Sequence, residues 1–490
     1  MSNTTMNNEK FLKKAEELRP ELIKESFTLD VIGKPMTEGE EHIFDFGNHY
    51  TGYITLDLSS VDHHPDAPLY LQLCFAEIRE ELDQDPEKYH GWISKGWIQE
   101  ERIHIDVLPT VYKLERRYAF RYIKLKVLAA SGNYSLLVNG ITVDSVSSAD
   151  YQKVTYPDFE AKDRRLDEVS LRTLHSCMQE VFEDGPKRDR RLWLGDLRLE
   201  ALVNYRTFRN NDLVKRCLYL FAGSTLENGM LASNVFIEPK VECDYQAMFD
   251  YTLFFICTLW DYYEETGDLQ ILRDLEETCL TQYRLLKECF DKKDLLDTSR
   301  TGRIFIDWNF ELDKQASGQA VYIYALKDLV RIEKALGKDG SEIEEEIARK
   351  TAAALTMFDR KKGLFVSGIG RQISWASQIW MILAGVLDEE ESRKVLERIA
   401  SVEDAVPLNS PYAYHHYIQA LIDAGEKDEA YEKMHEYWGG MIEKGADTFW
   451  EIYNPKDPYV SPYGGLVVHS FCHAWSCTPA YFLRKYYYSK

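Results

Sequence analysis

The sequence predicts two domains: an N-terminal β-sandwich followed by a barrel of paired helices. At 490 residues the chain is too long for one ordinary hydrophobic core. Apolar residues alternate with polar ones up to about residue 146 and recur at helical spacing beyond it. Roughly a dozen helical segments suit six hairpins closed into an (α/α)6 barrel, whereas the alternative, a helical solenoid, would show a fixed repeat. We therefore expect an N-terminal helix plus accessory β-sandwich in residues 1–146 and the barrel in residues 147–490.

The N-terminal part begins with a short helical pattern. Phe11, Ala15 and Leu18 stand at helical spacing before a turn at residues 33–35. Several short strands separated by turn signals then favour a sandwich. The alternating runs are residues 42–58, 69–78, 118–127 and 134–143.

A long polar insertion, residues 83–101, separates two of these strands and contains Trp92 and Trp97. Loops of this length are often functional, although surface ornament is the simpler interpretation. After Ser145 the pattern is helical to the end of the chain. The helical segments include residues 199–208, 218–222, 251–263, 275–290, 320–336, 343–358, 375–384, 414–424 and 426–438.

Composition excludes several classes of partner. The chain has 59 Lys and Arg against 81 Asp and Glu, a net charge of −22, so it repels nucleic acids and anionic membranes. The N-terminus lacks a secretory signal pattern and no apolar run approaches membrane-spanning length, which predicts a cytoplasmic protein. Nine scattered cysteines do not form a disulfide framework and indicate reduced, mostly buried thiols.

Residues 183–200 concentrate charged side chains around a Gly-Pro turn and Trp193. Within them Asp184, Asp189 and Asp196 alternate with four cations, which are Lys187, Arg188, Arg190 and Arg191. Such surroundings separate carboxyl pKa values, so that an acid and an anion can coexist at neutral pH. A sugar ring can stack on the Trp while carboxylates hold its hydroxyls. A salt-bridged turn between two helices is the alternative interpretation.

This stretch resembles the signature of the bacterial α-L-rhamnosidases, glycoside hydrolase family 78, where Asp-Cys-Pro leads through an Arg and an acidic residue to Trp and Gly-Asp. The resemblance implies that these positions bind rhamnose and supply the general acid, a Glu in that family. One alignment places Asp189 at the acid position and the other places Arg190, which cannot donate a proton. The matching residues are Asp184, Pro186, Arg188, Asp189, Trp193, Gly195 and Asp196.

Other segments resemble the same family. Residues 445–451 resemble Gly-Ala-Thr-Thr-x-Trp-Glu, which implies that Glu451 is the general base; alone, Asp447 and Glu451 would be a solvated pair at a helix start. His473 lies in a His-x-Trp-Ser segment and is a sugar-binding candidate or a core histidine. Two His and two Cys in residues 469–477 could suggest zinc, but no partner knuckle exists, so we predict no metal.

Two aromatic residues complete the predicted pocket. Residues 306–308 resemble the family's Gly-Asp-Trp segment, which contributes a ring to the rhamnose pocket, and this implies that Trp308 is that ring. Tyr251 falls roughly where the family has a Trp. A cluster of Tyr and His in residues 412–417 could instead serve a polysaccharide lyase, although one aromatic face of a barrel helix is the simpler interpretation.

The resemblance implies an inverting, exo-acting α-L-rhamnosidase that releases L-rhamnose from small glycosides without a metal or organic cofactor. Asp189 would be the acid and Glu451 the base. The alternatives are the same barrel acting on another sugar, a uronide lyase, and a non-catalytic sugar-binding homologue. We expect one pocket to gather the other predicted ligands of the sugar, which are Asp184, Arg188, Trp193, Asp196, Tyr251, Trp308 and His473.

Overall fold

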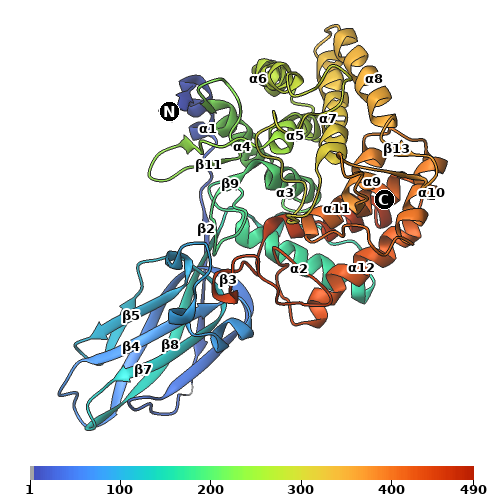
Figure 1. Cartoon of the computed structure of the whole chain (residues 1–490). Helices are drawn as coiled ribbons and strands as arrows, with labels where there is room; N and C mark the ends of the chain where they lie inside the picture. The colour runs from blue at the N-terminus through green and yellow to red at the C-terminus, as the bar shows by residue number, and fades with distance from the viewer. Residues whose placement is uncertain (1–4, 32, 490) are drawn as a thin grey trace.

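The computed structural model describes residues 5–31 and 33–489. It consists of an N-terminal sheet-rich domain followed by a helical domain (Figure 1). Within the described residues, the strands of the first domain form one antiparallel sheet in the order β2-β8-β3-β7-β4-β5, with β6 also paired to β3. These strands are β2 (Ile23–Asp30), β3 (Glu41–Asp62), β4 (Leu69–Ala76), β5 (Glu100–Ile105), β6 (Thr110–Lys113), β7 (Tyr118–Ala129) and β8 (Tyr134–Ser147).

The long strand β3 organises this sheet. Its first half pairs with β7 and its second half with β8, and both halves contribute alternate side chains such as Phe44 and Leu56 to one core. Gly52 is required at the changeover, because a Cβ there would lie 2.1 Å from the Asp144 carbonyl oxygen. The four predicted strands correspond to β3, β4, β7 and β8. Strand β2 was not predicted because it is exposed and mostly polar.

In the helical domain, every second helix packs on the next: α3 on α5, α5 on α7, α7 on α9 and α9 on α11. The intervening helices α4, α6, α8 and α10 each pack against one or both of their neighbours in this series. Side-chain caps at Asp268, Ser374 and Ser410 start α6, α9 and α11. The helices are α2 (Ala161–Cys177), α3 (Leu194–Arg206), α4 (Asn211–Gly223), α5 (Phe249–Thr266), α6 (Leu269–Lys287), α7 (Gln315–Ala335), α8 (Ser341–Leu355), α9 (Trp375–Leu383), α10 (Glu389–Ile399), α11 (Pro411–Asp423), α12 (Lys427–Glu443) and α13 (Pro479–Phe482).

Two sequence-based expectations need correction. The region after residue 147 is not purely helical. It also contains antiparallel strands of two or three residues, too short to leave a period in the sequence; they are β9 (Leu192–Trp193), β10 (Ser224–Leu226), β11 (Asn234–Phe236), β12 (Glu242–Cys243), β13 (Phe358–Asp359) and β14 (Leu364–Phe365).

The N-terminal helix α1 (Glu9–Glu17) is the second correction. Sequence order groups it with the sheet, but it packs on α4, and Phe11 and Ala15 join the helical domain's core (Figure 1). Strand β1 (Thr5–Asn7) pairs with β10 of the same domain. The apolar face of this helix is therefore covered by the helical domain rather than by the sheet.

All nine cysteines lie in the described part of the chain and are buried free thiols, as predicted. Among the described residues, no helix combines the length and the apolar character needed to cross a membrane.

A buried ion pair fixes the C-terminal segment on α2. Arg484 donates to both oxygens of Asp167 (2.7 and 2.8 Å) and to the carbonyls of Thr155 and Arg206. We predict that Arg484→Met lowers the free energy of unfolding by about 3–5 kcal/mol, because an unpaired carboxylate stays buried. Urea denaturation followed by circular dichroism measures this.

The control is Arg300→Met, which removes an exposed pair with Asp297 (3.0 Å). We expect it to change the same quantity by no more than about 1 kcal/mol. Equal losses in the two variants would contradict the assignment of Arg484 as a buried anchor.

Candidate active site

One cavity of about 410 Å³ gathers all the predicted site residues. It lies where helices α3 and α5 begin, and loops from distant parts of the chain close around it. The residues predicted from separate segments of the sequence therefore lie together, although they are only part of the lining that the structure describes. The predicted residues that line it are Asp184, Arg188, Asp189, Trp193, Asp196, Tyr251, Trp308, Glu451 and His473.

The Asp184 carboxylate shapes the turn that presents Asp189. Its two oxygens accept the backbone N–H groups of Asp189 and Arg191, each at 3.0 Å. Burial, together with the neighbouring charge of Asp189, raises the pKa of Asp184 to about 8. The turn directs the side chain of Arg190 away from the cavity, where it donates to the Arg117 carbonyl at 2.9 Å. Of the two residues that the alternative alignments place at the same position, Asp189 lines the cavity and Arg190 does not.

Glu451 is a buried carboxylate with two close partners. Arg188 Nη2 forms an ion pair with it, and the Tyr463 hydroxyl donates to its other oxygen. Burial raises the pKa of Glu451, whereas Arg188 and Tyr463 oppose that rise. Arg188 Nη1 also lies 3.2 Å from Asp189 Oδ1, so one guanidinium contacts both carboxylates. The guanidinium carbon of Arg188 also lies over the Tyr463 ring, 4.1 Å from the ring centroid, in a cation–π contact.

Several buried polar atoms around the cavity have no hydrogen-bond partner within the described part of the protein. Such atoms are rare in folded proteins unless a ligand or water satisfies them. Burial raises the pKa of Asp196 and lowers that of His473, which favours the neutral form of both. The cavity therefore offers uncharged donors and acceptors to a hydroxyl-rich ligand. These atoms are Asp196 Oδ1, His473 Nδ1, Trp193 Nε1 and Trp308 Nε1.

Aromatic rings form the walls. Trp193 packs edge to face on Tyr251, with 6.3 Å between the ring centroids, and Trp308 packs on Tyr463 in the same way, with 5.8 Å between the centroids. Gly195 permits this arrangement, because a Cβ at that position would lie 2.3 Å from the Tyr251 ring. The glycine of the signature is thus explained by the close approach of α3 to α5.

Sequence reasoning missed several residues of the site. Trp92 and Trp97 line the cavity, so the insertion of residues 83–101 is part of the site and the interpretation as surface ornament is wrong. Trp92 is held by a hydrogen bond from its Nε1 to the Pro462 carbonyl (2.7 Å). Two Trp residues in a polar loop were the available signal. Tyr463 carries no motif, and only the fold brings it to Glu451.

The other candidate clusters lie elsewhere. Among the described residues, the metal-type ligands that come within 4.8 Å of one another are His49, Glu77 and Cys472, outside the cavity. Tyr412 and His416 belong to α11, are buried and do not appear among the described residues that line the cavity. The 412–417 cluster is thus an aromatic face of a helix.

Comparison with known proteins adds to this geometry. Residues 12–145 match the N-terminal domain of glycosyl hydrolase family 78 α-rhamnosidases, and residues 159–487 match the six-hairpin glycosidase domain of bacterial α-L-rhamnosidases. The chain belongs to this family. Its match to the α-L-rhamnosidase six-hairpin domain covers every predicted residue of the cavity.

Individual members of the α-L-rhamnosidase family differ in how much of the chain they share. A rhamnosidase from Klebsiella oxytoca, solved with rhamnose bound, is 40% identical, with 99% of both chains covered and a TM-score of 0.94. A family 78 rhamnosidase of Bacillus sp. GL1 shares the fold at 22% identity, covering 94% of this chain and 47% of its own (TM-score 0.76). An α-L-rhamnosidase from Streptomyces avermitilis is 21% identical over 286 residues, and the chain spans 27% of that relative's length.

The Gly195 contact yields a stability prediction. We expect Gly195→Ala to lower the free energy of unfolding by about 1–3 kcal/mol, because the added methyl group overpacks against the Tyr251 ring. Thermal unfolding monitored by calorimetry measures this.

Gly439→Ala is the matched control, because a Cβ at this helical position meets no atom within 4 Å. It should be stabilising by roughly 0.5–1 kcal/mol, the helix preference of Ala over Gly. An increase in the free energy of unfolding for Gly195→Ala, as in the control, would contradict the tight contact between α3 and Tyr251.

Proposed function

We propose that this chain is an inverting, exo-acting α-L-rhamnosidase. The observation that carries the proposal is the convergence of Asp189 and Glu451 on one guanidinium, inside a cavity that also gathers the other predicted sugar ligands. These residues come from segments near residues 190, 250, 308, 450 and 473. Accidental convergence of a complete predicted set has little plausibility in a chain of 490 residues.

In this proposal the sheet is a β-sandwich and the helices form an (α/α)6 barrel. Both halves of the sheet face one core across β3, as the two layers of a sandwich do. The succession of contacts from α3 to α11 agrees with an inner ring of helices, and the loops that precede α3, α5 and α7 line the cavity. We place the division between the two domains near residue 146.

Asp189 is the proposed general acid and Glu451 the proposed base. An inverting pair needs room for a water molecule, about 6.5–9.5 Å between the carboxyl groups. The carboxylates of Asp189 and Glu451 contact different nitrogens of the planar, rigid Arg188 guanidinium, which keeps the two carboxylates apart. Arg188 and Tyr463 favour the ionised form of Glu451, which is the form that activates water.

The sugar pocket uses the neutral polar atoms and the rings. Asp196 and His473 would bind hydroxyls, with Trp193, Tyr251 and Trp308 as walls. Each oxygen of Asp184 accepts one backbone N–H and has a second lone pair, so Asp184 would also bind a sugar hydroxyl beside the proposed acid. A volume of about 410 Å³ suits one sugar unit and a small leaving group, which supports exo action on small glycosides.

Turnover and stereochemistry test the proposal together. The purified protein should hydrolyse p-nitrophenyl α-L-rhamnoside and release β-L-rhamnose first, which proton NMR detects at the anomeric signal. Release of the α anomer would refute the inverting mechanism. An unsaturated, ultraviolet-absorbing product from a pectic substrate, without rhamnoside turnover, would favour a lyase.

Substitution of the two carboxylates separates their roles. We predict that Asp189→Asn slows turnover about 10²–10⁴-fold for a rhamnoside with a poor leaving group, and much less for the aryl rhamnoside, whose oxygen needs no proton. Glu451→Gln should slow both alike, because water must be activated in either case. Steady-state kinetics on the two substrates measure these ratios.

Asp244→Asn is the control. Asp244 lines the cavity, and its carboxylate accepts hydrogen bonds from Asn234 Nδ2 and from the Tyr245 backbone N–H. It should leave the ratio between the two substrates unchanged. Equal losses on both substrates in Asp189→Asn would mean that Asp189 binds the sugar and is not the acid.

A further inference from the structure

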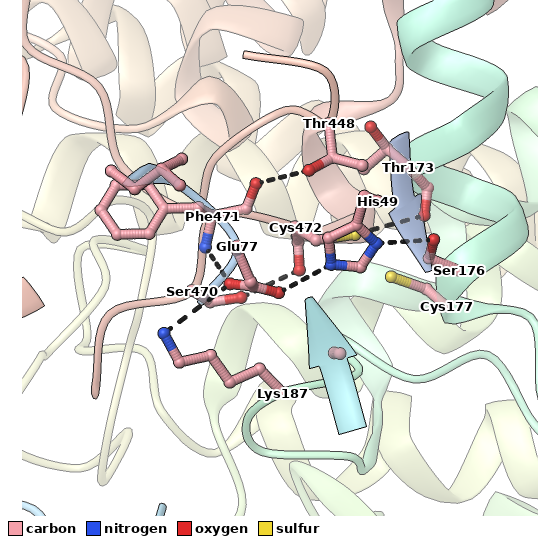
Figure 2. A network of polar contacts seen from close by, with 12 residues as sticks. His49, Glu77, Thr173, Ser176, Cys177, Lys187, Thr448, Ser470, Phe471 and Cys472 are labelled. Atoms are coloured by element: carbon pink, nitrogen blue, oxygen red, sulfur yellow. Dashed lines mark hydrogen bonds and ion pairs between the residues drawn. The ribbon is translucent and has the colours of Figure 1, made fainter. Parts of the chain in front are cut away.

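The sheet domain reaches into the helical domain directly behind the two catalytic segments. Figure 2 shows His49 and Glu77 there, facing Ser176, Lys187 and the segment 470–472. His49 lies on β3, and Glu77 follows the last residue of β4. Both side chains are fully buried.

Glu77 holds the segment that carries His473. One oxygen accepts the Phe471 backbone N–H at 2.6 Å, and the other lies 3.1 Å from His49 Nε2. The neighbouring residue of Phe471, Ser470, accepts the backbone N–H of Glu451 at 3.1 Å. A carboxylate of the sheet domain is thus two hydrogen bonds away from the backbone of the proposed base.

Lys187 connects Glu77 and Glu81 of the sheet domain to the loop that carries Arg188 and Asp189. It forms an ion pair with Glu81, lies 3.9 Å from Glu77 and donates to the His469 carbonyl at 2.8 Å. Arg188 is the next residue in the chain. The residue that precedes Arg188 is therefore a buried cation in contact with two carboxylates of the sheet domain.

His49 closes the network on the other side. Its backbone N–H donates to Asp447 at 2.7 Å, four residues before Glu451, and its Nδ1 lies 3.1 Å from Ser176 Oγ. Burial opposes charge on the ring, but contact with Cys472, Glu77 and Asp447 outweighs it and raises the pKa of His49 to about 9. Thr448 Oγ1 donates to the Phe471 carbonyl at 2.8 Å, so the segments 447–451 and 470–473 are also joined to each other.

Stability alone does not explain this network. Well-packed apolar residues are often as stabilising as buried ion pairs, because desolvating the charges is costly. Buried polar networks can fix one geometry, because a rearrangement would leave polar groups unpaired in a low-dielectric interior.

We propose that Glu77 and Lys187 are positioning residues of the catalytic site, through which the sheet domain sets the contact of Arg188 with Glu451. The role rests on the proposed function. The charged or titratable groups that face Glu77 are His49, Glu81, Lys187 and Cys472, and those that face Glu451 are Arg188, Tyr463 and Asp189.

The test uses full-length Glu77→Ala, Glu77→Gln and Lys187→Met with p-nitrophenyl α-L-rhamnoside. We expect kcat to fall about 10–100-fold in Glu77→Ala, the cost of a displacement of about 1 Å. Glu77→Gln should recover part of this loss, because its amide oxygen still accepts the Phe471 N–H.

The pH profile of kcat/KM is the readout that a purely structural role would not move. Arg188 opposes the rise in the pKa of Glu451, so loosening it raises that pKa further. The base works only when ionised, and activity is lost as the pH falls through its pKa. The acidic limb should therefore shift to higher pH in Glu77→Ala and Lys187→Met.

Tyr459→Phe is the control, because it removes a different contact between the domains, the hydrogen bond to Glu80 (2.9 Å). It should keep the wild-type acidic limb. Suppose that the wild type is active and that the folded Glu77→Gln and Lys187→Met variants keep its kcat and the acidic limb of its pH profile. This result would refute the positioning role alone, even if Glu77→Ala failed to fold. A wild type without turnover would refute the proposed function and the positioning role with it.

Discussion

The contact of one guanidinium with two carboxylates is the constraint on which the rest of the site depends. Arg188 must remain charged, buried and immobile between Asp189 and Glu451. The protein meets these requirements with a tyrosine ring beneath the guanidinium and a carbonyl of Val468 on its Nε. A buried cation is tolerated only where its donors are satisfied, so the surrounding loops have little freedom to move.

Those loops lie between two domains, and the sheet domain is therefore more than an accessory. It supplies buried acids behind the loops that carry the proposed acid and base, and two tryptophans to the wall of the cavity. The helical domain in turn takes the N-terminal helix onto its own surface. The two domains are thus interlocked along the chain, which favours one cooperative structure over two independent modules.

The sequence was informative where chemistry is local. The signature around Asp184 and the Trp-Glu pair at Glu451 carry their residue types in a fixed order, so the predicted ligands all reach the cavity. The contacts of Tyr463 and the proposed role of Glu77 could not be found in this way, because they arise across 12 and 394 positions of the chain. In the fold, long amphipathic segments were recognised, whereas polar β2 and the two-residue strands leave no periodic signal.

The cavity wall formed by residues 83–101 has a consequence for how such enzymes diversify. This loop connects two strands of a domain that contributes neither proposed carboxylate, and the free-energy cost of altering the length of a surface loop grows only slowly. Natural variation can therefore reshape this wall of the pocket while Asp189 and Glu451 remain untouched. Exchange of this one loop between homologues would accordingly change the shape of the cavity without changing either proposed carboxylate.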